Sequence, residues 1–205
     1  MIIVGAKGFA KELLVVFDQL GNTKNIVFFD NISEKLDGKL FEKFPILNNE
    51  IEVRKHFAEF DNNFSLGVGN PLIRKSLSEL FIKWGGTLKS VISPAANIGN
   101  YNNIIGDGTC IMTGTVITND VLIGEGSLIN LNCTIGHDSQ IGSYSELCPG
   151  VHISGNSKIG ELCFIGTGAV ILPGVEVGNM ARIGAGAVVS RNVGEKQTVK
   201  GIPAK

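Results

Sequence analysis

A six-residue repeat of aliphatic residues runs through the second half of the chain. From residue 105 to residue 189 every sixth position holds Ile, Leu or Val: Ile105, Ile111, Ile117, Ile123, Ile129, Ile135, Ile141, Leu147, Ile153, Ile159, Ile165, Ile171, Val177, Ile183 and Val189. Neither a helix, with a period of 3.6, nor an ordinary sheet, with a period of 2, keeps this spacing, but a β-solenoid does. One short strand in each hexad predicts triangular coils of eighteen residues.

The other positions of the hexad agree with this interpretation. Two residues before the aliphatic there is usually a small or β-branched residue, as at Thr115, Ser127 and Cys133, and positions two apart share one face of a strand. Three residues after it, Gly, Asn or Asp stands in twelve of the fifteen hexads. These types tolerate a positive φ at a turn. Ile92 and Ile98 start the pattern before a one-residue slip at 101–103, which predicts about six coils.

Residues 1–85 follow a different pattern. Apolar runs at 1–4, 26–29 and 64–68 predict strands, and segments at 13–20, 49–57 and 72–84 predict helices. Strands that alternate with helices indicate a small parallel sheet of Rossmann type. Residues 32–48 are expected to be irregular, and 87–91 to form a short strand. Gly85-Gly86 divides the chain into a Rossmann-like domain at 1–85 and a solenoid at 86–205.

Glycines and polar residues follow each predicted strand of the first domain, in the segments Gly5–Phe9, Asp30-Asn31 and Gly69-Asn70. Ligands of open parallel sheets bind at the carboxyl ends of the strands, so these segments predict a nucleotide or nucleotide-sugar pocket. Lys7 could meet a phosphate, and Asp30 could accept hydrogen bonds from a base or ribose. The alternative for each segment is a structural turn, because Gly-x-x-Gly is only half of a dinucleotide fingerprint.

Charge and cysteine content narrow the function classes. A formal net charge of -1 argues against nucleic acid or an anionic membrane as the main partner. There is no run of eighteen apolar residues, and the first four residues lead into glycines and not into a signal peptide. The four cysteines lack a Cys-x-x-Cys spacing, and no two of them are eighteen residues apart. They indicate a reduced, cytoplasmic protein without a cysteine metal site.

The chain has three histidines. We expect His56 on the surface of a helix. His137 follows a glycine at a corner of the prism, in a column of mostly polar or small residues, and should project outward. An imidazole is the natural general base near neutral pH, and Asp138 could hold its other ring nitrogen. The alternatives are that His137 is an ordinary exposed corner residue and Asp138 a tolerated turn residue.

His152 belongs to an outward column on one prism face. At eighteen-residue intervals this column reads Val116, Thr134, His152, Val170 and Val188. An exposed face this apolar is unusual for a monomer, so we hypothesise that it packs against another subunit. On that hypothesis His152 is an interface residue and not a ligand.

The segment 130–142, NLNCTIGHDSQIG, closely resembles the active-site segment of the hexapeptide-repeat sugar acyltransferases. The nearest subgroup contains sialic-acid O-acetyltransferases and bacillosamine-pathway N-acetyltransferases, and 5–8, 69–75 and 201–205 resemble it too. The resemblance implies a left-handed parallel β-helix, a cytoplasmic homotrimer with active sites between prisms, acetyl-CoA as donor and a nucleotide-linked amino sugar as acceptor. It implies an N-acetyltransferase of surface glycan or glycoprotein synthesis, and no metal.

The resemblance also implies residue roles. His137 would remove the proton from the attacking amine, and Asp138 would support it. Asn130 matches a family asparagine near the acceptor. The implied coenzyme contacts are Glu146, Thr167 and Ala185, and the implied nucleotide-sugar contacts are Lys7, Gly8, Phe9, Asp30, Asn31 and Gly69.

Two positions depart from the family pattern. Glu146 stands where relatives often have a histidine that contacts the acetyl group, and Gly8-Phe9 stands where relatives often have Gly-His. Three other functions stay open. The same scaffold can acylate a sugar hydroxyl. A zinc hydratase on this solenoid needs three histidines, and the solenoid offers only His137 and His152. A purely structural or binding solenoid is the third.

Overall fold

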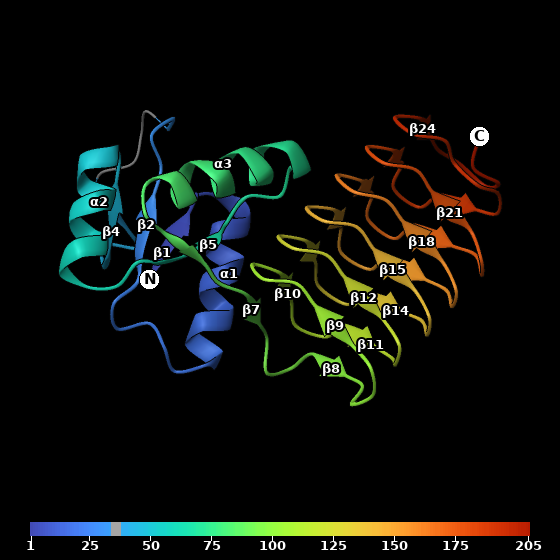
Figure 1. Ribbon diagram of the computed structural model, residues 1–205, viewed down its shortest axis with the longest axis horizontal. Coiled ribbons are helices and arrows are strands. Elements are labelled where there is room, and N and C mark those ends of the chain that lie inside the picture. Colours follow the sequence, from blue (N-terminus) through green and yellow to red (C-terminus); the bar gives the residue numbers. More distant parts are fainter. Residues whose placement is uncertain (34–37) are drawn as a thin grey trace.

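The computed structural model describes residues 1–33 and 38–205 and shows an α/β unit joined to a long solenoid. In Figure 1 the helices gather around a sheet at one end, and the coils of the solenoid extend away from them toward the C-terminus. The N-terminus lies within the α/β unit. The two parts follow the two hydrophobic patterns of the sequence.

The α/β unit has the predicted parallel sheet, in the order β3-β4-β2-β1-β5-β6. All neighbours pair in parallel except β3 and β4. Its elements are β1 Ile2–Val4, α1 Gly8–Gln19, β2 Val27–Phe29, β3 Lys39–Leu40, β4 Phe44–Leu47, α2 Glu50–Glu59, β5 Asn63–Leu66, α3 Pro71–Lys83 and β6 Thr87–Leu88. Pro71 opens α3, where its missing N–H costs nothing, and the Asn70 side chain accepts from Leu72 N and Ile73 N.

Two sequence predictions for this unit are wrong. Residues 32–48 were expected to be irregular, but β3 and β4 lie there; residues 34–37 of that segment are outside the described part of the chain. The two strands are short and β4 contains Pro45, so neither gives an alternating pattern. His56 was expected on the surface but is buried, and its ring stacks on Phe60 with centroids 5.0 Å apart.

The segment 87–91 contains two strands and not one. β6 pairs with β5 and completes the sheet of the α/β unit, whereas β7 at Val91–Ile92 pairs with β10 and begins the solenoid. The sheet of the first unit therefore takes in residues beyond Gly85-Gly86. The division at residue 85 stays a prediction.

The solenoid consists of two-residue strands that form three parallel faces. Face 1 contains β7, β10, β13, β16, β19, β22 and β24; face 2 contains β8, β11, β14, β17, β20 and β23; face 3 contains β9, β12, β15, β18 and β21. Their bounds are Val91–Ile92, Asn97–Ile98, Ile104–Ile105, Cys110–Ile111, Val116–Ile117, Leu122–Ile123, Leu128–Ile129, Thr134–Ile135, Gln140–Ile141, Glu146–Leu147, His152–Ile153, Lys158–Ile159, Phe164–Ile165, Val170–Ile171, Glu176–Val177, Arg182–Ile183, Val188–Val189 and Thr198–Val199. From β9 to β23 the strands on one face pair eighteen residues apart, as in Thr134 with His152, so the predicted coil is confirmed. β7 and β8 pair with partners nineteen residues on, across the slip at 101–103, and Arg182 pairs with Thr198, sixteen residues on.

The corner residues adopt the predicted left-handed backbone. Positive φ occurs at the Gly, Asn and Asp corners. It also occurs at Tyr144, Leu162 and Met180, the three corner residues between 108 and 186 that are not Gly, Asn or Asp. The N–H of each donates to the coil before it, to Glu125 O, Ser143 O and Glu161 O. Tyr144 and Leu162 also pack into a cluster shared with the α/β unit. Packing therefore stabilises side chains in a conformation that favours glycine.

Candidate active site

His137 lies at the corner between face 2 and face 3, directly after β14. Its side chain is 64% exposed, and its Nδ1 is 2.7 Å from Asp138 Oδ2. A carboxylate can only accept, so Nδ1 carries a hydrogen, and in the neutral imidazole the lone pair is then on Nε2. The outward orientation predicted for His137 is confirmed. Asp138 also has a φ of 59°, so it is both the turn residue and the partner of the imidazole.

The imidazole of His137 lies against the next coil. A Cβ atom at Gly155 would be 2.7 Å from both Nε2 and Cε1 of His137. Only a residue without a side chain leaves this position of the ring free. The same corner position holds Asn119 one coil earlier and Gly155 one coil later.

A pocket of about 300 Å³ lies at the carboxyl ends of the strands in the α/β unit. Five of the predicted substrate residues line it: Lys7, Gly8, Phe9, Asp30 and Asn31. Lys7 caps α1, whose first turn contains no acidic residue, so the N–H groups of that turn favour an anion. We call it the strand-end pocket. Sequence reasoning missed several of its lining residues: Ile32, Ser33, Gly67, Val68, Ile73 and Leu77.

Asp30 is held in its own loop. Its Oδ1 accepts from Ile32 N at 3.0 Å and Ser33 N at 2.9 Å, and its Oδ2 accepts from Ser33 Oγ at 2.9 Å. Burial acts to raise the pKa of Asp30, but these hydrogen bonds and the charge of Lys7 outweigh it and lower the pKa. The Asp30 carboxylate therefore fixes the loop at the rim of the pocket. A ligand that donates a hydrogen bond to Asp30 would do so alongside Ile32 and Ser33.

Gly69 and Glu146 meet where the α/β unit touches the solenoid. A Cβ atom at Gly69 would be 2.7 Å from Glu146 Oε1, and Gly69 does not line the strand-end pocket. Glu146 is 8% exposed. Burial raises the pKa of its carboxyl group, and the charge of Arg74 opposes the rise. The predicted contact of Glu146 with the coenzyme stays a prediction.

The three remaining predicted residues lie at the corner between face 1 and face 2. Asn130 follows β13 and is buried, and its Oδ1 accepts from Leu131 N at 2.8 Å. Thr167 and Ala185 are exposed and occupy the same corner position in two consecutive coils. Face 2 separates this corner from the corner of His137, so one chain does not bring Thr167 and Ala185 to the imidazole.

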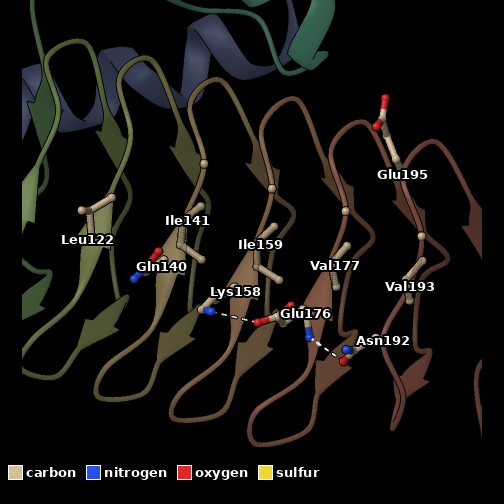
Figure 2. Close-up of a pocket in the computed structure, with 14 residues that line it drawn as sticks. Leu122, Gln140, Ile141, Lys158, Ile159, Glu176, Val177, Asn192, Val193 and Glu195 are labelled. Carbon is tan, nitrogen blue, oxygen red and sulfur yellow. Dashed lines mark hydrogen bonds and ion pairs between the residues drawn. The ribbon is translucent and has the colours of Figure 1, made fainter.

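A second hollow runs along face 3, with a volume of about 420 Å³. Figure 2 shows Lys158 directed at Glu176 across it, with Nζ 2.9 Å from Oε1, and none of the predicted site residues lines it. The two charges neutralise each other, and both side chains are more than half exposed. Such a pair offers a ligand little binding energy.

Within residues 1–33 and 38–205, no group of three or more His, Cys, Asp or Glu side chains has the arrangement of a metal site. No helix in that part of the chain has the length and apolarity to span a bilayer. All four cysteines are buried and free. Burial raises the pKa of the Cys148 thiol to about 12 and that of Cys133 to about 11. Neither thiol is therefore an activated nucleophile.

These features define a class: a hexapeptide-repeat acyltransferase whose solenoid has an exposed histidine–aspartate pair and whose Rossmann-like unit has a strand-end pocket. The family model of the PglD N-terminal domain matches residues 1–81, and that of the bacterial transferase hexapeptide (six repeats) matches residues 156–191. No curated protein sequence matches the chain.

Solved structures match over the full length. The acetyltransferase domain of PglB from Neisseria gonorrhoeae is 30% identical, with a TM-score of 0.90, over 100% of this chain and 97% of that chain. PerB from Caulobacter crescentus, in complex with CoA and GDP-perosamine, is 27% identical, with a TM-score of 0.90, over 100% and 95%. WeeI from Acinetobacter baumannii is 29% identical, with a TM-score of 0.90, over 100% and 99%. The chain belongs to the hexapeptide-repeat sugar acyltransferases with a PglD-type N-terminal domain, and its solenoid is a left-handed parallel β-helix.

Proposed function

We propose that the protein transfers the acetyl group of acetyl-CoA to the amine of a nucleotide-linked amino sugar. The observation that carries the proposal is the exposed His137 imidazole, with Nδ1 bound to Asp138 and Nε2 free. Two structural relatives support the substrates, since a PglB structure holds acetyl coenzyme A and the PerB structure holds CoA and GDP-perosamine.

In this reaction the sugar nitrogen attacks the thioester carbonyl, a C–N bond forms and the C–S bond breaks. His137 Nε2 accepts the proton that the nitrogen loses and can return it to the departing thiolate, so the imidazole ends neutral. Asp138 holds Nδ1–H, which fixes the tautomer and stabilises the imidazolium in between. The pair therefore supplies both proton transfers.

The strand-end pocket holds the nucleotide in this proposal. Lys7 and the N-terminus of α1 give it a cationic edge for phosphate groups. Phe9, Ile73 and Leu77 give it apolar walls. Its volume of about 300 Å³ is at the lower end of the range for small-molecule sites, which suits part of a nucleotide sugar, with the sugar extending outside.

The active site is completed in a homotrimer. Thr167 and Ala185 lie across face 2 from His137, so a neighbouring copy must bring its own donor corner to the imidazole. Face 2 presents the column of Val116, Thr134, His152, Val170 and Val188 outward, and Thr134 Oγ1 is 2.8 Å from His152 Nδ1. Both substrates are intracellular metabolites and the four thiols are free, so we place the enzyme in the cytoplasm.

The test is a transfer assay with acetyl-CoA and nucleotide-linked amino sugars that carry UDP, GDP or dTDP. Release of free thiol measures the rate, and mass spectrometry of the product locates the acetyl group. We expect a gain of one acetyl group on nitrogen. Acetylation of a sialic acid hydroxyl with no activity on any amine would instead show an O-acetyltransferase. No thiol release with any acceptor would contradict both.

A further inference from the structure

Helix α3 contacts both the strand-end pocket and the solenoid. Ile73 and Leu77 line the strand-end pocket, while Arg74 and Ser78 are fully buried. Residues four apart share one face of a helix, so Ile73 and Leu77 form one face of α3 and Arg74 and Ser78 form the adjacent face. Tyr144 OH lies 3.3 Å from Ser78 Oγ and donates to Glu125 Oε1 at 2.8 Å, so the second face is the one that meets the solenoid.

Arg74 joins the two units through one guanidinium group. Its Nη1 donates to Leu66 O at 2.9 Å and to Val68 O at 2.7 Å, both at the carboxyl end of β5. Its Nε donates to Gly126 O in the solenoid at 2.9 Å. Val68 lines the strand-end pocket, and the coil that begins at Gly126 also carries His137. The rigid fork of an arginine holds three acceptors at fixed relative positions, which an ammonium group does not.

Glu146 supplies the opposite charge at the same junction. Its carboxylate lies against Gly69, the residue after Val68, and the charge of Arg74 acts on it. The end of β5 therefore lies between the Arg74 guanidinium of the α/β unit and the Glu146 carboxyl group of the solenoid.

We propose that Arg74 is a positioning residue for acyl transfer. It holds the pocket wall at the end of β5 at a fixed distance from the coil that carries His137, so that a sugar anchored by its nucleotide reaches the acyl group. This inference rests on the function proposed above. Arg74 touches no substrate, because its guanidinium contacts three backbone carbonyls and the Cys110 thiol and the residue is 0% exposed.

The experiment compares Arg74→Met and Arg74→Lys with the wild-type full-length protein, well below the melting temperature of each. We measure kcat, the KM for the nucleotide amino sugar, and the Kd of coenzyme A and of the nucleoside diphosphate alone. We expect Arg74→Met to lower kcat/KM for the nucleotide sugar about 10²-fold, the cost of a misplacement of about 1 Å, and leave both Kd values unchanged. Arg74→Lys, which keeps the charge and some donors, should recover part of the loss.

Cys110→Ala is the matched control. Cys110 Sγ is the fourth partner of the guanidinium, at 3.8 Å from Nη2, and its loss leaves the three carbonyl contacts in place. This variant should transfer at the wild-type rate. Wild-type kcat and KM in Arg74→Met, or a weakened Kd for coenzyme A in both Arg74 variants, would overturn the positioning role. If Arg74→Met does not fold, Arg74→Lys decides. A wild-type kcat/KM in Arg74→Lys would overturn the positioning role, and a partly lowered kcat/KM would support it. An inactive wild-type protein overturns the proposed function as well, so the two failures are distinct.

Discussion

Gly155 provides the space that the His137 imidazole occupies: a Cβ atom there would lie 2.7 Å from Nε2. The backbone of Gly155 is outside the left-handed region, and the atoms in the way are the far end of a movable side chain. Gly155→Ala should therefore leave the fold intact and turn the ring aside. We expect turnover to fall about 10²-fold with little change in melting temperature. Steady-state kinetics and thermal unfolding check this, and unchanged turnover would show that the ring has another catalytic position.

Glu146 should reduce stability at neutral pH. Burial raises the pKa of its carboxyl group above the ordinary value of 4.5, so its favourable contribution to folding is present below pH 4.5 and is lost as pH rises through the raised value. Glu146→Gln cannot ionise. Its melting temperature relative to wild type should increase between pH 4 and pH 7. Thermal unfolding over that range tests the sign, and a relative melting temperature that falls with pH would mean that attraction to Arg74 outweighs burial.

His56 should make the fold sensitive to mild acid. Burial lowers its pKa from 6.5, and the N-terminal amine nearby acts in the same direction, while Asp61 and Glu59 oppose them. In the folded protein Nε2 is buried and has no hydrogen-bond partner. Because the unfolded chain binds the proton more readily, wild-type stability should fall as pH drops below 6.5.

The His56→Leu variant isolates this effect, since all other titrating groups stay the same. Its melting temperature relative to wild type should rise from pH 7 to pH 5. Differential scanning calorimetry at half-unit intervals measures the difference. A constant difference would show that His56 accepts a proton in the folded protein as easily as in the unfolded one.

Face 2 should carry the trimer contact. Val170→Arg places a charge within its outward column, next to His152 in the β-ladder. We expect the mass in solution to fall from about three chains to one chain of 21.8 kDa, and transfer to fall with it. Gln140→Arg adds the same charge on face 3 and should keep the mass. Light scattering measures the mass in solution of the wild type and of both variants. A single-chain mass for the wild type would contradict the trimer.

The sequence predicts the solenoid well, because each hexad forms one strand and one corner and the period is local. It also places His137 outward, since its column is polar. It does not reveal Arg74, which has the spacing of an ordinary helix residue and becomes buried only when α3 meets Gly126, 52 residues away. The burial of Glu146 against Gly69 has the same origin. Contacts between the α/β unit and the solenoid depend on how the two units pack together, and no local sequence pattern predicts that packing.

The most direct measurement is the rate of thiol release from acetyl-CoA by wild-type protein and by His137→Ala, with the same nucleotide-linked amino sugar. Loss of a general base should lower kcat by about 10²–10⁴-fold, while the Kd of coenzyme A and the trimer mass stay unchanged. A His137→Ala variant that turns over at the wild-type rate would remove the imidazole from the reaction and contradict the account.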